Sequence, residues 1–116
     1  MTSDESITRV LKLAEERGLT HANLGMIEAN GIYRAKRYNV RHLAKSMKEG
    51  IAWVSIPSGL DPADRIIESN PFVDPATGYR DAVLRMDSDS CRETPFDSDG
   101  EGLLLLGKFI GSLADY

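Results

Sequence analysis

The sequence predicts an α+β protein in which a small mixed sheet packs on one or two helices. An Asn30-Gly31 dipeptide separates two strand-like runs within Leu24–Tyr38. This predicts a hairpin with a two-residue turn, because Asn-Gly readily takes positive φ at both central positions. Two segments, Thr2–Arg17 and Asn39–Lys48, carry apolar residues at helical spacing. Further strand-like segments follow, and this order is typical of a small sheet that grasps a crossing helix.

Both predicted helices have one apolar face and identifiable ends. In Thr2–Arg17 the capping-box spacing of Thr2 and Glu5 marks the start, and Gly18 suits the end. Asn39 is a good N-cap for the second helix. The apolar stripes are Ile7, Val10, Leu11 and Ala14 in the first helix, and Val40, Leu43, Ala44 and Met47 in the second. The second helix is therefore expected to lie on the sheet with its basic side outward.

The rest of the chain alternates between predicted strands and turns. Ile51–Ile56, Tyr79–Met86 and Leu103–Ile110 are predicted strands, and Cys91–Phe96 is a short edge segment because Pro95 interrupts it. Asp61–Glu68 is predicted to form one or two helical turns, Ser69–Gly78 a loop, and Asp87–Ser90 and 97–100 turns. The dispersed glycines, which include Gly25, Gly31, Gly50, Gly59 and Gly78, are interpreted as turn residues.

Length and composition limit the possible functions. A chain of 116 residues is expected to form a single domain over 1–116. The net charge of -4 argues against a nucleic-acid binder, which needs a basic surface. We expect no membrane partner, because the apolar runs are far too short to span a bilayer and no signal peptide is visible. The single cysteine, Cys91, excludes an internal disulfide and fits a reducing cytoplasm.

No cluster of residues predicts catalysis or metal binding. Asp97, Asp99 and Glu101 have calcium-loop spacing, but Lys108 occupies the position that must supply a bidentate carboxylate. The two histidines have no second ligand at helical spacing. Cys91 has no histidine nearby in the sequence to activate it. We therefore predict no catalytic residue and no metal site in this chain.

Basic residues gather between the predicted second strand and the second helix. They are Arg34, Lys36, Arg37, Arg41, Lys45 and Lys48, of which Arg34 and Lys36 fall on one face of their strand. Such a basic face could engage a phosphate, RNA or an acidic partner. The simpler interpretation is a solvated helix face and sheet edge, which charge runs usually are.

Several short motifs together resemble the N-terminal β-grasp domain of the glutamine synthetase family, and most closely its γ-glutamyl-amine and -polyamine ligase branch. The family's acidic strand, turn and Arg-Gly-Lys correspond to Glu28, Asn30-Gly31 and Arg34-Ala35-Lys36. Its later motifs correspond to Met47–Gly50, Gly78–Asp81, Val83–Asp87, Ser90 and Pro95-Phe96. The resemblance covers roughly Thr2–Ile110 and implies a β-grasp fold.

The chain also departs from the family pattern. Ala35 replaces the middle glycine of Arg-Gly-Lys, and Met86 replaces the proline before Asp87. The Asp-Gly-Ser-Ser loop of the bacterial enzymes, whose aspartate helps to bind ammonium, is absent, and its place falls near Trp53-Val54-Ser55. Loss of that aspartate is compatible with an amine substrate or with no catalysis.

The resemblance implies a role beside a catalytic chain rather than an activity of this chain alone. In the family, the ligands for ATP, glutamate and Mg²⁺ or Mn²⁺ lie in a larger C-terminal domain, and the β-grasp domain of one subunit closes the active site of its neighbour. The expected partner is therefore a glutamine synthetase-type catalytic chain, or a second copy through self-association. Trp53 and Asp81 are the candidate partner-facing residues by position, although both could be core and turn residues. The alternative is a non-catalytic β-grasp module that binds a protein through its sheet edge or through Arg34, Lys36, Arg41 and Lys45.

Overall fold

The computed structural model describes residues 4–54, 61–67, 81–95 and 102–111. The helices in chain order are α1 (Asp4–Glu16), the short 3-10 helix η1 (Val40–His42) and α2 (Leu43–Glu49). The strands are β1 (His21–Ile27), β2 (Tyr33–Asn39), β3 (Ile51–Val54), β4 (Asp81–Glu93) and β5 (Leu103–Ile110). The predicted α+β class is confirmed.

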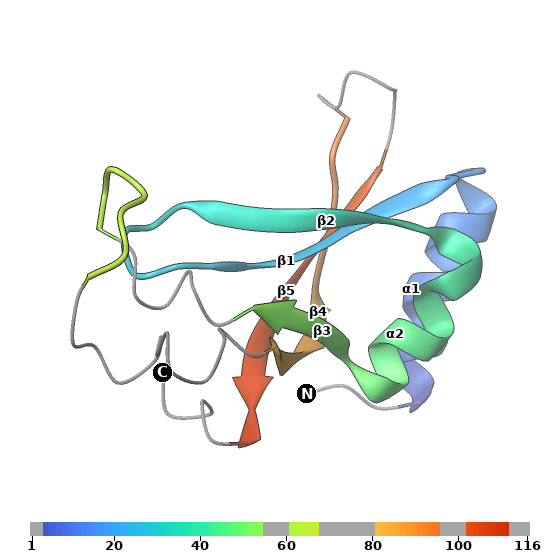
Figure 1. Ribbon diagram of the computed structural model, residues 1–116. Coiled ribbons are helices and arrows are strands. Elements are labelled where there is room, and N and C mark those ends of the chain that lie inside the picture. Colours follow the sequence, from blue (N-terminus) through green and yellow to red (C-terminus); the bar gives the residue numbers. More distant parts are fainter. Residues whose placement is uncertain (1–3, 55–60, 68–80, 96–101, 112–116) are drawn as a thin grey trace.

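The five strands form one mixed sheet in the order β2-β1-β5-β4-β3 (Figure 1). The strands β1 and β5 are parallel, while the other neighbouring pairs are antiparallel. The hairpin of β1 and β2 forms a long arm with α1 and α2 at one end and the hairpin tip at the other (Figure 1). A first hairpin, a helix and a central parallel pair of strands make up the β-grasp arrangement that the resemblance implied.

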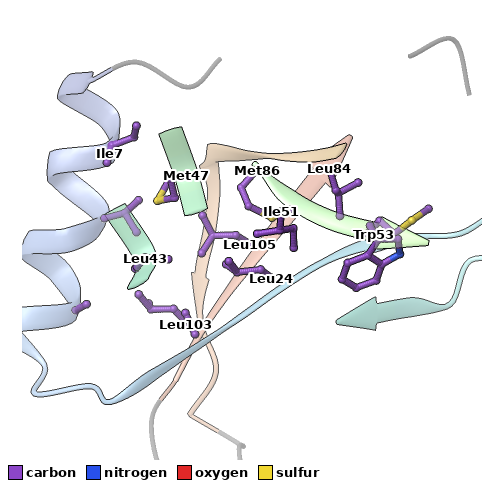
Figure 2. Packing of buried hydrophobic residues seen from close by; sticks show 14 of the residues in the cluster. Ile7, Leu24, Leu43, Met47, Ile51, Trp53, Leu84, Met86, Leu103 and Leu105 are labelled. Atoms are coloured by element: carbon purple, nitrogen blue, oxygen red, sulfur yellow. The ribbon is translucent and has the colours of Figure 1, made fainter. Parts of the chain in front are cut away.

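The core lies between the two helices and one face of the sheet. Leu24, Leu84 and Leu105, from three neighbouring strands, have no exposed surface. Leu43 and Met47 of α2 pack against this face, and Ile7 of α1 lies beside them (Figure 2). These residues are the apolar stripes expected from the sequence, and burial of such side chains drives the helices onto the sheet.

The two predicted helices are confirmed, with changes at their ends. The first helix ends at Glu16, and Gly18 follows with φ 63°. The second begins as the 3-10 turn η1, and Asn39 caps this turn by accepting a hydrogen bond of 3.0 Å from the backbone N–H of Arg41. Arg41, Lys45 and Lys48 are exposed, as the outward basic face required.

The hairpin is confirmed, but the predicted two-residue Asn-Gly turn is wrong. The turn spans Glu28 to Gly31, because the Gly31 N–H donates to the carbonyl of Glu28 at 2.9 Å. Only Gly31, with φ 81°, takes positive φ there. The Glu28 carboxylate explains the shift: its Oε1 accepts from the backbone N–H groups of Asn30 at 2.8 Å and of Ile32 at 3.1 Å. A longer turn closed by an internal carboxylate replaces the tight one.

The pKa of Glu28 makes this turn sensitive to acid. Burial acts to raise the pKa, but the hydrogen bonds from Ile32 and Asn30, with the charge of Arg34, outweigh burial and lower it. A group with a lowered folded pKa stabilises the fold above its unfolded pKa, and that contribution is lost as the pH falls through the folded value.

We therefore expect Glu28→Gln to flatten the acid limb of the stability profile. The free energy of unfolding of the wild type, measured by urea at a series of pH values, should fall from about pH 5 to pH 3, and that of the variant should fall less. Glu15→Gln, at an exposed position on α1, is the matched control and should follow the wild type. Equal acid sensitivity in wild type and Glu28→Gln would contradict the role of the carboxylate.

The predicted short helix after Asp61 is wrong. Asp61 does act as a cap, since its Oδ1 accepts from the N–H groups of Ala63 and Arg65, both at 2.9 Å. The hydrogen bond from the Arg65 N–H is the largest cause of the lowered pKa of Asp61. Asp64 then takes a left-handed φ of 62°, and the N–H of Asp61 donates back to the Arg65 carbonyl at 2.8 Å. These features close a compact turn and prevent a helix.

The predicted turn at Asp87–Ser90 is also wrong, because these residues continue β4. The ladder between β4 and β5 shifts register between Asp87 and Arg92, as in a β-bulge. Side chains support the shift: the Leu106 N–H donates to Ser90 Oγ at 2.8 Å, and Asp87 Oδ1 accepts from the Asp89 N–H at 2.9 Å. Turn-forming residue types are thus used inside a strand.

Other strand predictions have mixed outcomes. The segment Cys91–Glu93 belongs to the long β4, and not to a separate edge strand. The first strand begins at His21, before the predicted run that starts at Leu24. Leu103–Ile110 is confirmed as a strand, and the third strand is confirmed over Ile51–Val54. The predicted loop Ser69–Gly78, the turn at 97–100 and the calcium-loop carboxylates lie outside the described residues.

Candidate functional site

Two cations of β2 lie on the same face of the sheet as the core. In the antiparallel ladder, Arg34 stands opposite Met26 and Lys36 stands opposite Leu24. Met26 and Leu24 are buried, so Arg34 and Lys36 project over the edge of the core and not away from it. The prediction that Arg34 and Lys36 share one face of their strand is therefore confirmed. Both charges lie on β2, at one edge of the sheet.

Lys36 connects the two edge strands. Its Nζ donates to the carbonyl of Ala52 on β3 at 3.1 Å and lies 5.0 Å from the centroid of the Trp53 ring. The strands β2 and β3 are at opposite ends of the sheet order. The sheet must therefore curl until its two edges approach each other, and the cation closes the gap through a cation–π contact and a hydrogen bond.

Trp53 is the largest side chain beneath this closure. Only 5% of Trp53 is exposed, and it lies at the end of the buried cluster farthest from α1 (Figure 2). Its indole Nε1 is buried and has no hydrogen-bond acceptor within residues 4–54, 61–67, 81–95 and 102–111. The buried position satisfies the core interpretation of Trp53, while the unused N–H is unusual for a buried tryptophan.

Arg34 lies on the same face of β2 as Lys36, nearer the hairpin tip. One of its terminal nitrogens, Nη2, contacts Oδ1 of Asp64 in the turn that follows Asp61. The side chain of Arg34 is 27% exposed, and its Nε is buried without an acceptor in the described part of the chain. We call Arg34, Lys36 and Trp53 the Trp53 cluster. It combines two cations with two buried donors that have no acceptor.

Asp81 lies on the neighbouring strand. It begins β4 and pairs with Val54, the residue after Trp53. Asp81 is exposed. The structure thus brings the two candidate partner-facing residues to adjacent strands at one end of the sheet. Their role toward a partner stays a prediction.

The predicted basic face divides into two parts. Arg34 and Lys36 belong to the Trp53 cluster, whereas Arg41 and Lys45 lie on η1 and α2, at the other end of the hairpin arm (Figure 1). Arg41 Nε donates to Nε2 of its neighbour His42 at 3.3 Å. A single ligand that touches all four cations would have to follow the length of β2.

A second group of polar residues lines a groove of about 220 Å³ between α1 and β4. Ser88 donates to Ser6 across the groove, and Arg9 pairs with Asp89 at 3.2 Å. Burial raises the pKa of the Cys91 thiol, which disfavours the reactive thiolate. These contacts hold α1 and β4 together. The surroundings of Cys91 do not favour the thiolate that a reactive cysteine needs.

The hydroxyl group of Tyr33 has a structural role. The Tyr33 hydroxyl lies 3.2 Å from the carbonyl oxygen of Asn23 and 3.0 Å from that of Leu105, and burial raises the pKa of Tyr33 to about 12. It links the hairpin arm to the central strand, β5.

Within the described ranges, no group of three or more His, Cys, Asp or Glu side chains could bind a metal ion. No described helix is long and apolar enough to cross a membrane.

The partners of Arg34 and Lys36 in the Trp53 cluster could not be predicted from the sequence. Asp64 and the Ala52 carbonyl come from segments far from β2 in the sequence, and the contacts depend on the curl of the sheet. The only sequence signal for the cluster was the spacing of Arg34 and Lys36. Neither that spacing nor composition could place the Trp53 indole beneath Lys36.

Comparisons with solved structures find the same fold in part of larger chains. A novel glutamine synthase homolog matches with a TM-score of 0.65 and 23% identity, over 81% of this chain and 22% of that chain. GmaS, solved as a complex with ADP, matches with a TM-score of 0.62 and 17% identity, over 88% of this chain and 20% of that one. Apo GmaS gives a TM-score of 0.62 and 16% identity, over 89% and 21%.

No family model and no curated protein matched the sequence. The chain spans about one fifth of the solved chains that it matches. The resemblance seen in the sequence is therefore confirmed as a likeness of structure: this chain has the fold of one segment of GmaS and of a glutamine synthase homolog.

Proposed function

We propose that this chain is a glutamine synthetase-like N-terminal domain that completes the active site of an ATP-dependent ligase. The ligase would join glutamate to ammonia or an amine, forming glutamine or a γ-glutamylamide, in the cytoplasm. The observation that carries the proposal is the match of most of this chain to about one fifth of a glutamine synthase homolog and of GmaS. We further propose that a separate catalytic chain supplies the part that corresponds to the remaining four fifths of those solved chains.

The described residues do not fit the metal chemistry of such a ligase. They offer no cluster of carboxylate, histidine or cysteine side chains that suits Mg²⁺ or Mn²⁺. We propose that the catalytic chain binds both ATP and the metal. This chain would contribute a wall of the reaction chamber, with exposed Asp81 facing the partner and buried Trp53 supporting that end of the sheet.

Complementation tests this division of labour. The purified chain is assayed for γ-glutamyl hydroxamate with glutamate, ATP, Mg²⁺ and hydroxylamine, alone and mixed with a glutamine synthetase catalytic chain that lacks its own N-terminal segment. We expect no turnover by the chain alone and turnover by the mixture. Asp81→Asn should lower the turnover of the mixture, and Glu15→Gln, on exposed α1, should not.

Robust turnover by the chain alone would contradict the proposal, as would a mixture no more active than the catalytic chain by itself. A mixture that fails to react, together with specific capture of an unrelated protein that is lost on charge reversal of Arg41 and Lys45, would support the non-catalytic module instead. Both residues are exposed and lie away from the Trp53 cluster, so charge reversal there should leave the fold intact.

A further inference from the structure

We propose that Asn30, at the tip of the hairpin of β1 and β2, is a site of spontaneous deamidation, and that the Glu28 carboxylate restrains the reaction. The products are aspartate and isoaspartate at position 30, and the only co-reactant is water. The tip lies at the end of the hairpin arm away from α1 and α2 (Figure 1). The inference goes beyond the proposed function, because it concerns the chemistry of this chain alone.

The reaction joins two neighbouring residues. The backbone nitrogen of Gly31 attacks Cγ of the Asn30 side chain and forms a C–N bond. The side-chain nitrogen of Asn30 leaves as ammonia, together with the proton that the Gly31 nitrogen loses. Water then opens the resulting succinimide ring at either carbonyl, which gives aspartate or isoaspartate. No group is oxidised or reduced.

The sequence and the exposure of the turn favour this position. Gly31 has no Cβ to shield its backbone nitrogen, so the Asn30 side chain can approach closely. Both residues are exposed, and water therefore has access to the succinimide. Asn30 is the only asparagine of the chain that is followed by glycine. The others are Asn23, Asn39 and Asn70, which precede Leu24, Val40 and Pro71.

Hydrogen bonds to Glu28 hold both reacting groups in the folded turn. The Gly31 N–H donates to the Glu28 carbonyl at 2.9 Å, and Asn30 Nδ2 donates to Glu28 Oε2 at 3.0 Å. The Gly31 nitrogen must give up its hydrogen bond to attack, and Cγ of Asn30 must turn toward that nitrogen. Glu28 Oε1 also accepts from the backbone N–H of Asn30 at 2.8 Å, which fixes the backbone beside the two groups. The carboxylate therefore slows the reaction in the folded protein.

The product destabilises the turn that protected its precursor. An aspartate carboxylate at position 30 would lie where Asn30 Nδ2 now lies, 3.0 Å from Glu28 Oε2, and two ionised carboxylates this close repel each other. Arg34, whose charge acts on Glu28, already contacts Asp64 as well. Isoaspartate in addition lengthens the backbone of the turn by one carbon. Deamidation thus loosens the hairpin tip.

Mass spectrometry of the full chain tests the site. The chain is incubated in mildly alkaline buffer, folded or in urea, and digested. The peptide that contains position 30 is followed for the gain of one mass unit and for isoaspartate. We expect Asn30 to react about tenfold faster in urea than in the folded wild type, a factor that corresponds to about 1.4 kcal/mol of lost hydrogen bonding. Asn23 and Asn39 should remain amides in both samples.

Glu28→Gln separates the restraint from general unfolding. It keeps the size of the side chain but replaces one acceptor oxygen by an NH2 group, so one of the Asn30 donors loses its acceptor. The folded variant should deamidate about threefold faster or more, because a hydrogen bond to a charged acceptor is lost. Glu15→Gln, on exposed α1, is the matched control and should keep the wild-type rate.

Asn30→Asp imitates one product and should unfold at a lower temperature than the wild type near neutral pH. Thermal unfolding also checks that each variant is folded, and the comparison of folded and unfolded wild type needs no variant. The proposal is overturned if Asn30 stays an amide in urea, or if folded and unfolded wild type react at the same rate. It is equally overturned if folded Glu28→Gln keeps the wild-type rate, or if Asn30→Asp is as stable as the wild type.

Discussion

Gly25→Ala is expected to destabilise the protein by roughly 3 kcal/mol or more, at the upper end of overpacking effects. Gly25 lies in the middle of β1, where a Cβ would be 2.0 Å from the carbonyl oxygen of Arg34 and 2.7 Å from the Cα of Ala35. Both atoms belong to the backbone of β2, so no flexible side chain can move aside. The hairpin arm would have to separate or change its register.

Urea unfolding of Gly25→Ala measures this cost, and Gly18→Ala is the matched control. Gly18 has φ 63°, but a Cβ there would meet no atom within 4 Å. Only left-handed backbone strain is introduced, worth roughly 1–2 kcal/mol. If Gly25→Ala lost no more stability than Gly18→Ala, the close approach of the two strands would be refuted.

Leu105→Ala is expected to cost roughly 2–5 kcal/mol, the range for large-to-small changes in a core. Leu105 has no exposed surface and lies on β5, between β1 and β4. It pairs with Leu24 across the parallel ladder, and both point to the helices. A cavity there would be surrounded by strands on both sides, which limits collapse around it. Such a loss is a large fraction of the 5–15 kcal/mol typical of a domain.

Leu104→Ala is the matched control for Leu105→Ala, because it removes the same atoms from the next residue of the same strand. Leu104 points to the other face of the sheet and is only partly buried. Its free energy of unfolding should therefore change by less than half as much. Equal losses for the two variants would show that the helix-covered face is not the main core.

Helices and most strands could be predicted because their signals are local. The stripe of Ile7, Val10 and Ala14 and the apolar run of β5 each depend on neighbours within one element. The resemblance added the order of these elements. It implied the grasp fold that the solved structures then confirmed.

The wrong predictions concern residues whose long-range contacts override their local conformational preference. Asp87 and Ser90 are turn-forming residues, yet pairing with β5 keeps them in a strand, with their side chains supporting the bulge. Gly25 was interpreted as a turn glycine, but its lack of a side chain serves close strand packing. The candidate site was hardest to foresee, because Lys36 and Trp53 meet only after the whole sheet curls.

The position of β5 in the sheet has a consequence for how the chain is made. This strand is the last described strand in the chain, yet it joins the hairpin of β1 and β2 to the pair of β3 and β4. A chain emerging from the ribosome can form those two halves separately, but it cannot unite them until residues 103–110 are free of the exit tunnel. Nascent chains stalled before that point should therefore remain open to proteases and chaperones, and protection should appear in a single late step.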